Sequence, residues 1–157
     1  PVIAEVKVRS PKEGQLLRGR DPGELAAAYE AGGAVGISVV TEPHDFGGSL
    51  QIVERVREVT DLPILRKDFP RSRSDIDATV DAGAQVILLT IKMIDPDGFA
   101  RLHDLAIGAG LETLVGTSAS TRPPRSWPAS LTTWRPWPWS AATRTRSWRS
   151  SGGPHRP

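Results

Sequence analysis

The chain has 157 residues, with 20 lysines and arginines, 18 acidic residues and no cysteine, and its formal net charge is +2. This length suits one ordinary domain, and the lack of cysteine excludes disulfides and cysteine-bound metals. No apolar run is long enough to span a membrane. Because the chain begins at Pro1 with no charged-then-apolar leader, we expect it to start inside a longer chain.

The near-neutral charge averages two unlike parts of the chain. Residues 1–115 hold all 18 acidic residues, whereas residues 116–157 hold seven arginines and no acidic residue. All five tryptophans and seven of the 14 prolines also lie in residues 116–157. The two parts are therefore interpreted separately.

Five short apolar runs in the first part, each expected to form a strand, alternate with four segments of helical pattern. The expected strands are 1–7, 34–41, 62–67, 85–90 and 112–115. The expected helices are 22–31, 49–58, 74–82 and a last one that opens at Asp95 and stops near 108–110. Asp21-Pro22 before the first helix and Gly32 after it are typical start and stop signals.

Apolar strands separated by amphipathic helices predict an α/β fold with a parallel sheet covered by helices. An open doubly wound sheet and a (β/α)₈ barrel both fit this order of elements. A complete barrel needs about 250 residues, so this chain would hold only part of one. No Gly-x-Gly-x-x-Gly motif follows the first strand, which weakens a dinucleotide-binding interpretation.

Charged side chains stand where the first and third expected strands end. Glu5 and Lys7 share one face of the first strand because alternate residues point the same way, and Lys67 falls where the third strand becomes a loop. Ligands of both candidate architectures meet this end of the strands. Arg66 and Asp68 flank Lys67 and alternate to the other side, so we interpret them as structural.

A carboxylate beside two ammonium groups suits acid–base chemistry. A partly buried lysine with a second lysine nearby has a depressed pKa and donates a proton near neutral pH. Such cations also attract a phosphate or carboxylate of a substrate. An ion pair at the mouth of a barrel, without a catalytic role, explains the same spacing.

Several motifs of the first part occur together in one known family. In chain order they are VIAEVKVRSPK at 2–12, AGGA at 31–34, ISVVTE at 37–42, FGGS at 46–49, LRKDF at 65–69, AGA at 82–84 and GLETLV at 110–115. In these residues the chain resembles indole-3-glycerol-phosphate synthase. The resemblance covers residues 1–115 and implies a (β/α)₈ TIM barrel, present as about four and a half βα units.

The resemblance implies a carbon–carbon lyase, a carboxy-lyase of tryptophan biosynthesis in the cytoplasm. The family closes the ring of 1-(2-carboxyphenylamino)-1-deoxyribulose 5-phosphate, releasing CO₂ and water, and needs no metal or organic cofactor. By resemblance Lys67 is the general acid on the ketone, and Lys7 holds the anthranilate carboxylate. Glu5 acts in the later dehydration or orients Lys7.

The resemblance also implies residues that bind substrate. Ser10, in the first loop, is expected to help bind it, and Phe46, Phe69 and Leu88 are expected to form part of an apolar wall for its aromatic ring. Ordinary packing in the core or in loops is the competing interpretation for the last three residues.

The resemblance ends at Val115. The family has a catalytic glutamate at the end of its fifth strand, where this chain has Gly116. We find no counterpart in residues 117–157 to the family's later strands and phosphate-binding loops. We therefore expect no measurable turnover from the chain.

Residues 116–157 show neither helical nor strand periodicity, and their residue types are those of GC-rich codons. We expect a disordered tail or the product of a shifted reading frame. Because arginine and tryptophan bind single-stranded nucleic acid, the alternative function is a non-catalytic fragment whose tail binds it. Otherwise the expected partner is a phosphorylated small molecule, with no membrane and no nucleic acid. The oligomeric state stays open.

Overall fold

The computed structural model describes residues 1–116, and the rest of the expected tail lies outside them. The strands of the central sheet are β1 (Ile3–Val6), β4 (Gly36–Val40), β5 (Ile64–Lys67), β6 (Val86–Thr90) and β7 (Glu112–Gly116). The helices are α1 (Pro22–Ala31), α2 (Leu50–Arg57), α3 (Arg73–Asp81) and α4 (Pro96–Gly108). Two further pieces are a short hairpin, β2 (Arg9–Ser10) with β3 (Gly14–Gln15), and a 3₁₀ turn, η1 (Ile91–Met93).

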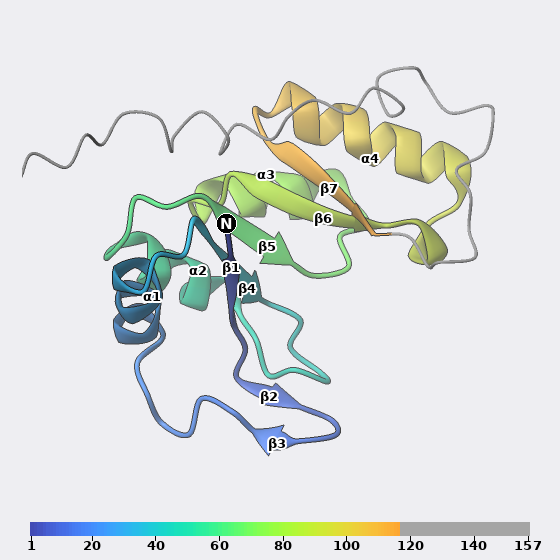
Figure 1. The fold of residues 1–157 in the computed structure, drawn as a ribbon. Helices are drawn as coiled ribbons and strands as arrows, with labels where there is room; N and C mark the ends of the chain where they lie inside the picture. Colours follow the sequence, from blue (N-terminus) through green and yellow to red (C-terminus); the bar gives the residue numbers. More distant parts are fainter. Residues whose placement is uncertain (117–157) are drawn as a thin grey trace, which may run out of the picture. The chain divides into compact units, whose positions relative to one another are not determined.

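The central sheet is parallel throughout, and its strands stand in the order β1-β4-β5-β6-β7 (Figure 1). Each strand therefore pairs with the next strand of the sheet along the chain. A doubly wound sheet instead reverses its strand order at a switch point. The observed order is that of consecutive units of a barrel wall.

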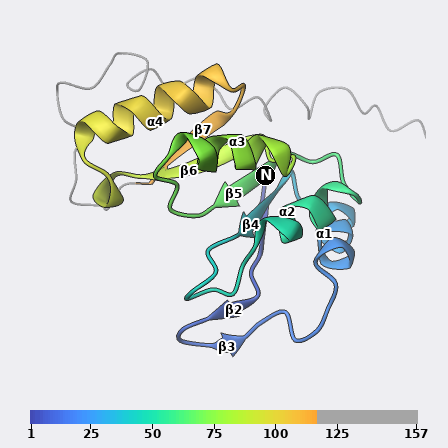
Figure 2. The same cartoon turned by 180° about the vertical axis from the view of Figure 1, so that it is seen from behind.

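The helices cover a single side of this sheet (Figures 1 and 2). The core between the sheet and the first two helices consists of completely buried aliphatic side chains: Val6, Ala26, Ile37, Val39, Val53, Val56 and Ile64. On the same side, the Arg66 side chain of β5 donates to Thr79 Oγ1 of α3. Helix α4 packs on β6 and β7 through a buried face that includes Phe99 and Leu102. A one-sided helix layer settles the alternative in favour of the partial barrel.

Side-chain caps account for where α1, α3 and α4 begin, whereas Ser49 before α2 makes no capping hydrogen bond. The Asp21 side chain accepts a hydrogen bond from Glu24 N at 2.9 Å, and helix α1 has the bounds that the sequence predicts. Asp95 caps α4 in the same way. Helix α3 begins one residue earlier than predicted, because Ser72 and Asp75 form a capping box. The hairpin and η1 were not predicted, since elements of two or three residues carry no periodicity.

Glycine is required at one turn beside the carboxyl ends of the strands. A Cβ added at Gly48 would lie 2.3 Å from Val40 O and 2.7 Å from the Thr41 backbone. The loop that follows β4 thus lies directly against the end of that strand. Gly108 at the end of α4 differs, because an added Cβ there meets nothing within 4 Å.

Replacing Gly48 by alanine is expected to lower the free energy of unfolding by about 1–3 kcal/mol, because the loop must move off the strand. Gly108→Ala is the matched control and is expected to raise it by up to about 1 kcal/mol, as alanine favours helix. Urea unfolding followed by circular dichroism measures both. Equal effects of the two substitutions would contradict the close approach at Gly48.

Candidate functional site

Two lysines from neighbouring parts of the sheet meet on one carboxylate. Lys7 Nζ lies 3.1 Å from Glu5 Oε1, and Lys67 Nζ lies 2.6 Å from Glu5 Oε2. Glu5 is on β1, Lys7 is the first residue after β1, and Lys67 is the last residue of β5. In the sheet, β4 lies between β1 and β5. The sequence prediction that Glu5 and Lys7 share a face and that Val6 points away is confirmed, since Val6 is completely buried among the helices.

A pocket of about 110 Å³ lies beside the two lysines, and we call it the lysine pocket. It is lined by Lys7, Val40, Glu42, Phe46, Lys67, Asp68, Phe69 and Leu88. These residues come from the ends of β4 and β5, the loops that follow them, β6 and the residue after β1. The lining combines two cations with two aromatic rings at the carboxyl ends of parallel strands, where barrel enzymes carry their sites.

The structure brings together most of the side chains singled out from the sequence. Lys7, Phe46, Lys67, Phe69 and Leu88 line the lysine pocket, and Glu5 holds both of its lysines. Ser10 lies elsewhere. It belongs to the hairpin, where its Oγ accepts a hydrogen bond from Lys12 N at 3.3 Å, and it does not line the pocket. The roles of all these residues stay predictions.

Opposing influences act on the Glu5 carboxyl. Burial is the largest and raises its pKa, but the hydrogen bonds from Lys67 and Lys7, together with their charges, outweigh it. The pKa of Glu5 therefore lies below its ordinary value of 4.5. Each ammonium group has three donors, so the lysines keep N–H groups for a ligand after binding Glu5.

Glu42, which sequence reasoning did not assign to the site, lines the pocket from the first residues after β4. Its carboxylate is buried and accepts three backbone hydrogen bonds, from His44 N at 2.9 Å, Asp45 N at 2.8 Å and Phe46 N at 3.1 Å. Burial has the largest effect on its pKa and raises it, but the three amides together hold the pKa below the ordinary range. Its place directly after an apolar strand was the signal available in the sequence.

Asp68 is the second lining residue that was not assigned to the site. Its Oδ2 accepts from Arg66 Nη2 at 2.8 Å and from Thr41 Oγ1 at 2.7 Å, and its Oδ1 accepts from Phe69 N at 2.8 Å. Arg66 is buried on the helix side, as its position predicted, and it also binds Thr79. Asp68 thus joins this structural network to the pocket, whereas the sequence placed it with Arg66 alone.

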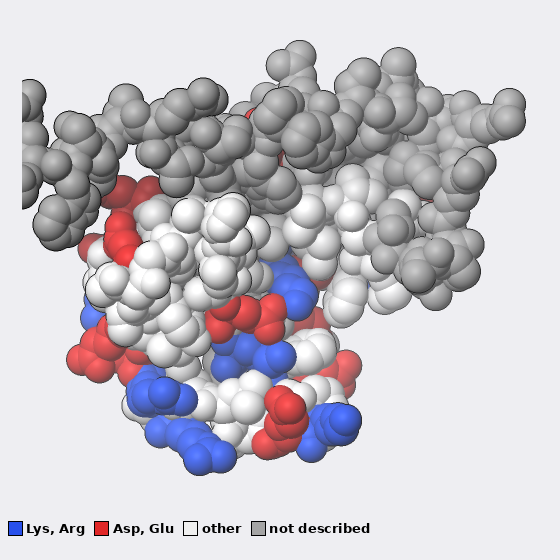
Figure 3. Space-filling model, viewed as in Figure 1, with Lys and Arg blue, Asp and Glu red and all other residues white. Residues whose placement is uncertain are grey.

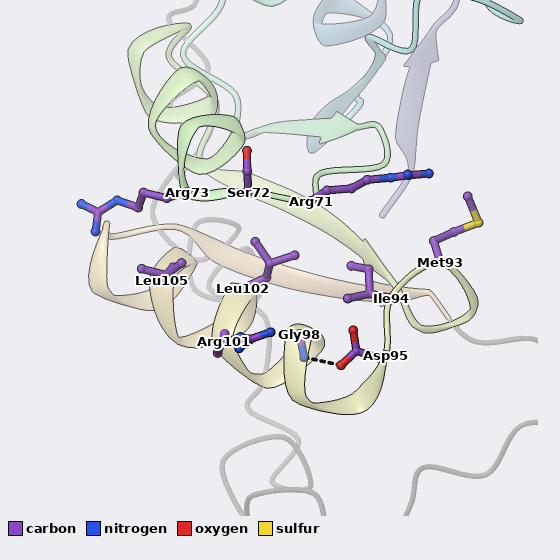
Figure 4. A pocket seen from close by; sticks show the side chains of 10 residues that line it. All are labelled: Arg71, Ser72, Arg73, Met93, Ile94, Asp95, Gly98, Arg101, Leu102 and Leu105. Carbon is purple, nitrogen blue, oxygen red and sulfur yellow. Dashed lines mark hydrogen bonds between the residues drawn. The ribbon is translucent and has the colours of Figure 1, made fainter.

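A larger pocket, of about 350 Å³, lies between the first turns of α3 and α4 and contains none of the predicted site residues. Figure 4 shows that the side chains of Arg71 and Arg73 extend to opposite sides of it. The Asp95 carboxylate in its wall caps α4 through Gly98 N. Its charged groups therefore do not converge on one ligand position.

The surface charges of the described residues are mixed in sign. Figure 3 shows acidic and basic side chains interleaved over the visible face of residues 1–116, without a large basic area. Within this part of the chain, no group of three or more histidines and carboxylates is placed to hold a metal ion. No helix in the described range is long and apolar enough to cross a membrane.

A parallel barrel wall with lysines, a carboxylate and aromatic rings at its carboxyl ends defines the class of a (β/α)₈-barrel enzyme. The family model described as "Indole-3-glycerol phosphate synthase" matches residues 1–123, eight residues beyond the motifs found by inspection. The chain belongs to the indole-3-glycerol phosphate synthase family.

Two relatives with this name show how far the match extends. The Pyrococcus abyssi protein is 46% identical over 115 residues, which are 73% of this chain and 50% of that protein. The Nocardioides sp. protein is 51% identical over 114 residues, 73% of this chain and 44% of the relative. The chain therefore spans about half the length of the curated relatives it matches.

Among solved structures, a mandelate oxidase variant aligns with a TM-score of 0.50 at 19% identity. The alignment covers 71% of this chain and 41% of that chain. At this identity the likeness concerns the fold alone.

The lowered pKa of Glu5 predicts a specific pH dependence of stability. Since the unfolded chain takes up the proton first, the stabilisation by this carboxylate is fully present above pH 4.5 and is lost as the pH falls through the lower folded-state value. Glu5→Gln is expected to be less stable than the parent chain at pH 7, and the difference is expected to shrink as the pH falls below 4.5 and Glu5 takes up its proton.

Urea unfolding midpoints at several pH values test this expectation. The control is Glu54→Gln, which removes an exposed carboxylate from α2. It is expected to change the pH profile little. A stability difference between Glu5→Gln and the parent chain that stays constant from pH 7 to pH 3 would contradict the pairing.

Proposed function

We propose that this part of the barrel carries the residues that perform the ring closure in indole-3-glycerol-phosphate synthase. The observation that supports it is the lysine pair on Glu5 beside an aromatic-lined pocket, in a chain of this family. The substrate would be 1-(2-carboxyphenylamino)-1-deoxyribulose 5-phosphate, a phosphorylated small molecule. The reaction is a carboxy-lyase step of tryptophan biosynthesis, which we place in the cytoplasm.

In this proposal the new bond forms between a carbon of the aromatic ring and the ketone carbon. Lys7 acts on the aromatic side of this bond and Lys67 on the ketone side. The Lys7 ammonium pairs with the carboxylate on the aromatic ring, and the phenylalanine rings contact that ring. Lys67 donates a hydrogen bond, and then a proton, to the ketone oxygen while the ring carbon attacks the ketone carbon. Loss of CO₂ and then of water completes the indole.

Glu5 has two tasks that fit its place between the lysines. It holds both ammonium groups in place, because each of them forms an ion pair with one of its two oxygens. In the dehydration step a carboxylate next to Lys7 also serves as the base-assisting group that the family resemblance implies. Nucleic-acid binding by the tail concerns residues outside those the structure describes, and no observation favours it.

Anthranilate is a fluorescent fragment of the substrate and tests the carboxylate subsite. Lys7→Met is expected to weaken its binding by roughly tenfold to a hundredfold, the loss typical of a hydrogen bond to a charged group. Lys12→Met, which removes an exposed lysine from the hairpin turn, is the control and is expected to bind like the parent chain. Equal affinities of all three chains would exclude Lys7 from the site.

The end of β7 offers a test of catalysis. A Cβ at Gly116 would lie 3.4 Å from Leu88 Cδ1 and from Thr90 Oγ1, which is ordinary contact on the pocket side of the sheet. The chain as it stands is expected to give no measurable indole-3-glycerol phosphate. Gly116→Glu supplies the missing carboxylate but not the later strands and phosphate-binding loops of the family, so it is also expected to give no measurable product.

Product fluorescence measures the turnover. Gly108→Glu, which adds the same charge at an open position of α4, is the control and is expected to remain inactive. Turnover by the parent chain, or by Gly116→Glu but not by Gly108→Glu, would contradict the expectation that the missing strands and loops are required.

A further inference from the structure

The two carboxylates that line the lysine pocket share one arrangement. Each lies just beyond the end of a parallel strand, Glu42 two residues after β4 and Asp68 one residue after β5. Each accepts three hydrogen bonds from the protein, and in both cases one donor is the backbone N–H of a phenylalanine in the pocket wall. The repetition on two neighbouring strands links each ring to the carboxylate at the end of its own strand.

Both carboxylates are bound to the protein through both of their oxygens. Glu42 accepts from the loop amides, and Asp68 accepts from Arg66, Thr41 and Phe69. Their chemistry is therefore that of acceptors that fix the loops.

The loop of Phe46 is held at a few points along its length. It is fastened at Glu42, at the Gly48 contact with the end of β4, and at Phe46 O, which accepts from Arg9 N at 3.1 Å. Phe69 follows Asp68 directly, and its ring is 40% exposed, so packing alone holds it weakly. In both places the carboxylate binds the backbone N–H of the residue that carries the ring.

We propose that Glu42 and Asp68 are positioning residues that set the rings of Phe46 and Phe69 in the lysine pocket and thereby determine its fit to a planar aromatic acid. The choice of an aromatic acid as ligand rests on the proposed function, whereas the positioning of the rings does not. Each ring is controlled separately, Phe46 by Glu42 and Phe69 by Asp68.

Fluorine NMR tests the positioning without any ligand, because the chain contains only three phenylalanines. In protein labelled with 4-fluorophenylalanine, Phe46→Leu and Phe69→Leu assign two signals, and the buried Phe99 of α4 gives the third. Glutamine in place of Glu42 turns one acceptor oxygen into a donor facing backbone N–H groups. Glu42→Gln is therefore expected to shift or broaden the Phe46 signal and to leave the other two unchanged.

Asp68→Asn is expected to do the same to the Phe69 signal alone. Asp21→Asn is the matched control, since this carboxylate also binds an arginine and a backbone amide, at the start of α1. It is expected to leave all three signals in place. Unchanged signals of Phe46 and Phe69 in the two pocket variants would overturn the proposal, as would a uniform change of all three signals.

A second variant covers the case in which Glu42→Gln does not fold. Glu42→Asp keeps the charge but is one methylene shorter, so it is expected to disturb the same signal. If neither variant at this position folds, Glu42 is a structural residue and the proposal fails there.

Anthranilate binding separates the positioning from the proposed function. Glu42→Gln and Asp68→Asn are expected to weaken it by roughly tenfold to a hundredfold, as small displacements of positioning groups do. Shifted ring signals without any anthranilate binding by the parent chain would leave the positioning intact and reject the aromatic acid as ligand. Ring signals that stay fixed while the parent chain binds anthranilate would reject the positioning and leave the proposed function intact.

Discussion

Every strand of the sheet sends alternate side chains to opposite sides, and the rest of the structure depends on this alternation. On one side Val6, Ile37 and Ile64 pack against helices, and on the other side Glu5, Val40 and Lys67 face the site. A shift of one residue in any strand would bury the lysines and expose the core. The same pattern that excludes water from the core therefore delivers the charged groups to one place.

Arg66 is the exception, because it is a charged residue on the helix side. Its guanidinium is buried, and its partners are Thr41, Asp68, Thr79 and the carbonyl oxygen of Asp75. A buried cation without such partners would cost several kcal/mol, roughly, in desolvation. Through these hydrogen bonds Arg66 connects the ends of β4 and β5 to α3. Arg66 is the residue before Lys67, so the network lies beside the site.

The sequence predicted the five strands and four helices of the described residues because periodicity and caps are local signals. It also predicted that Lys7 and Lys67 would meet at Glu5, since the ends of parallel strands converge. It did not predict that Glu42 and Asp68 line the pocket, because their partners are backbone amides whose positions depend on the path of the loops. Alternation alone placed Asp68 with Arg66, whereas its second oxygen binds the loop of Phe69. Ser10 was assigned by resemblance, and its hairpin is too short to leave a pattern.

The consecutive order of the strands has a consequence for how the protein is made. Each pairing in the sheet, such as Ile3 with Gly36 or Val86 with Glu112, joins segments separated by one α-helix with the loops and short elements beside it. Closing stretches of this length costs less chain entropy than closing longer ones. Because each strand of the central sheet pairs with the strand of that sheet before it in the chain, the partner of every new strand has already been translated. The strands can therefore pair in the order in which they are translated. The lysine pair on Glu5 needs only β1, the residue after it and β5, all of which are translated before α3, β6, α4 and β7.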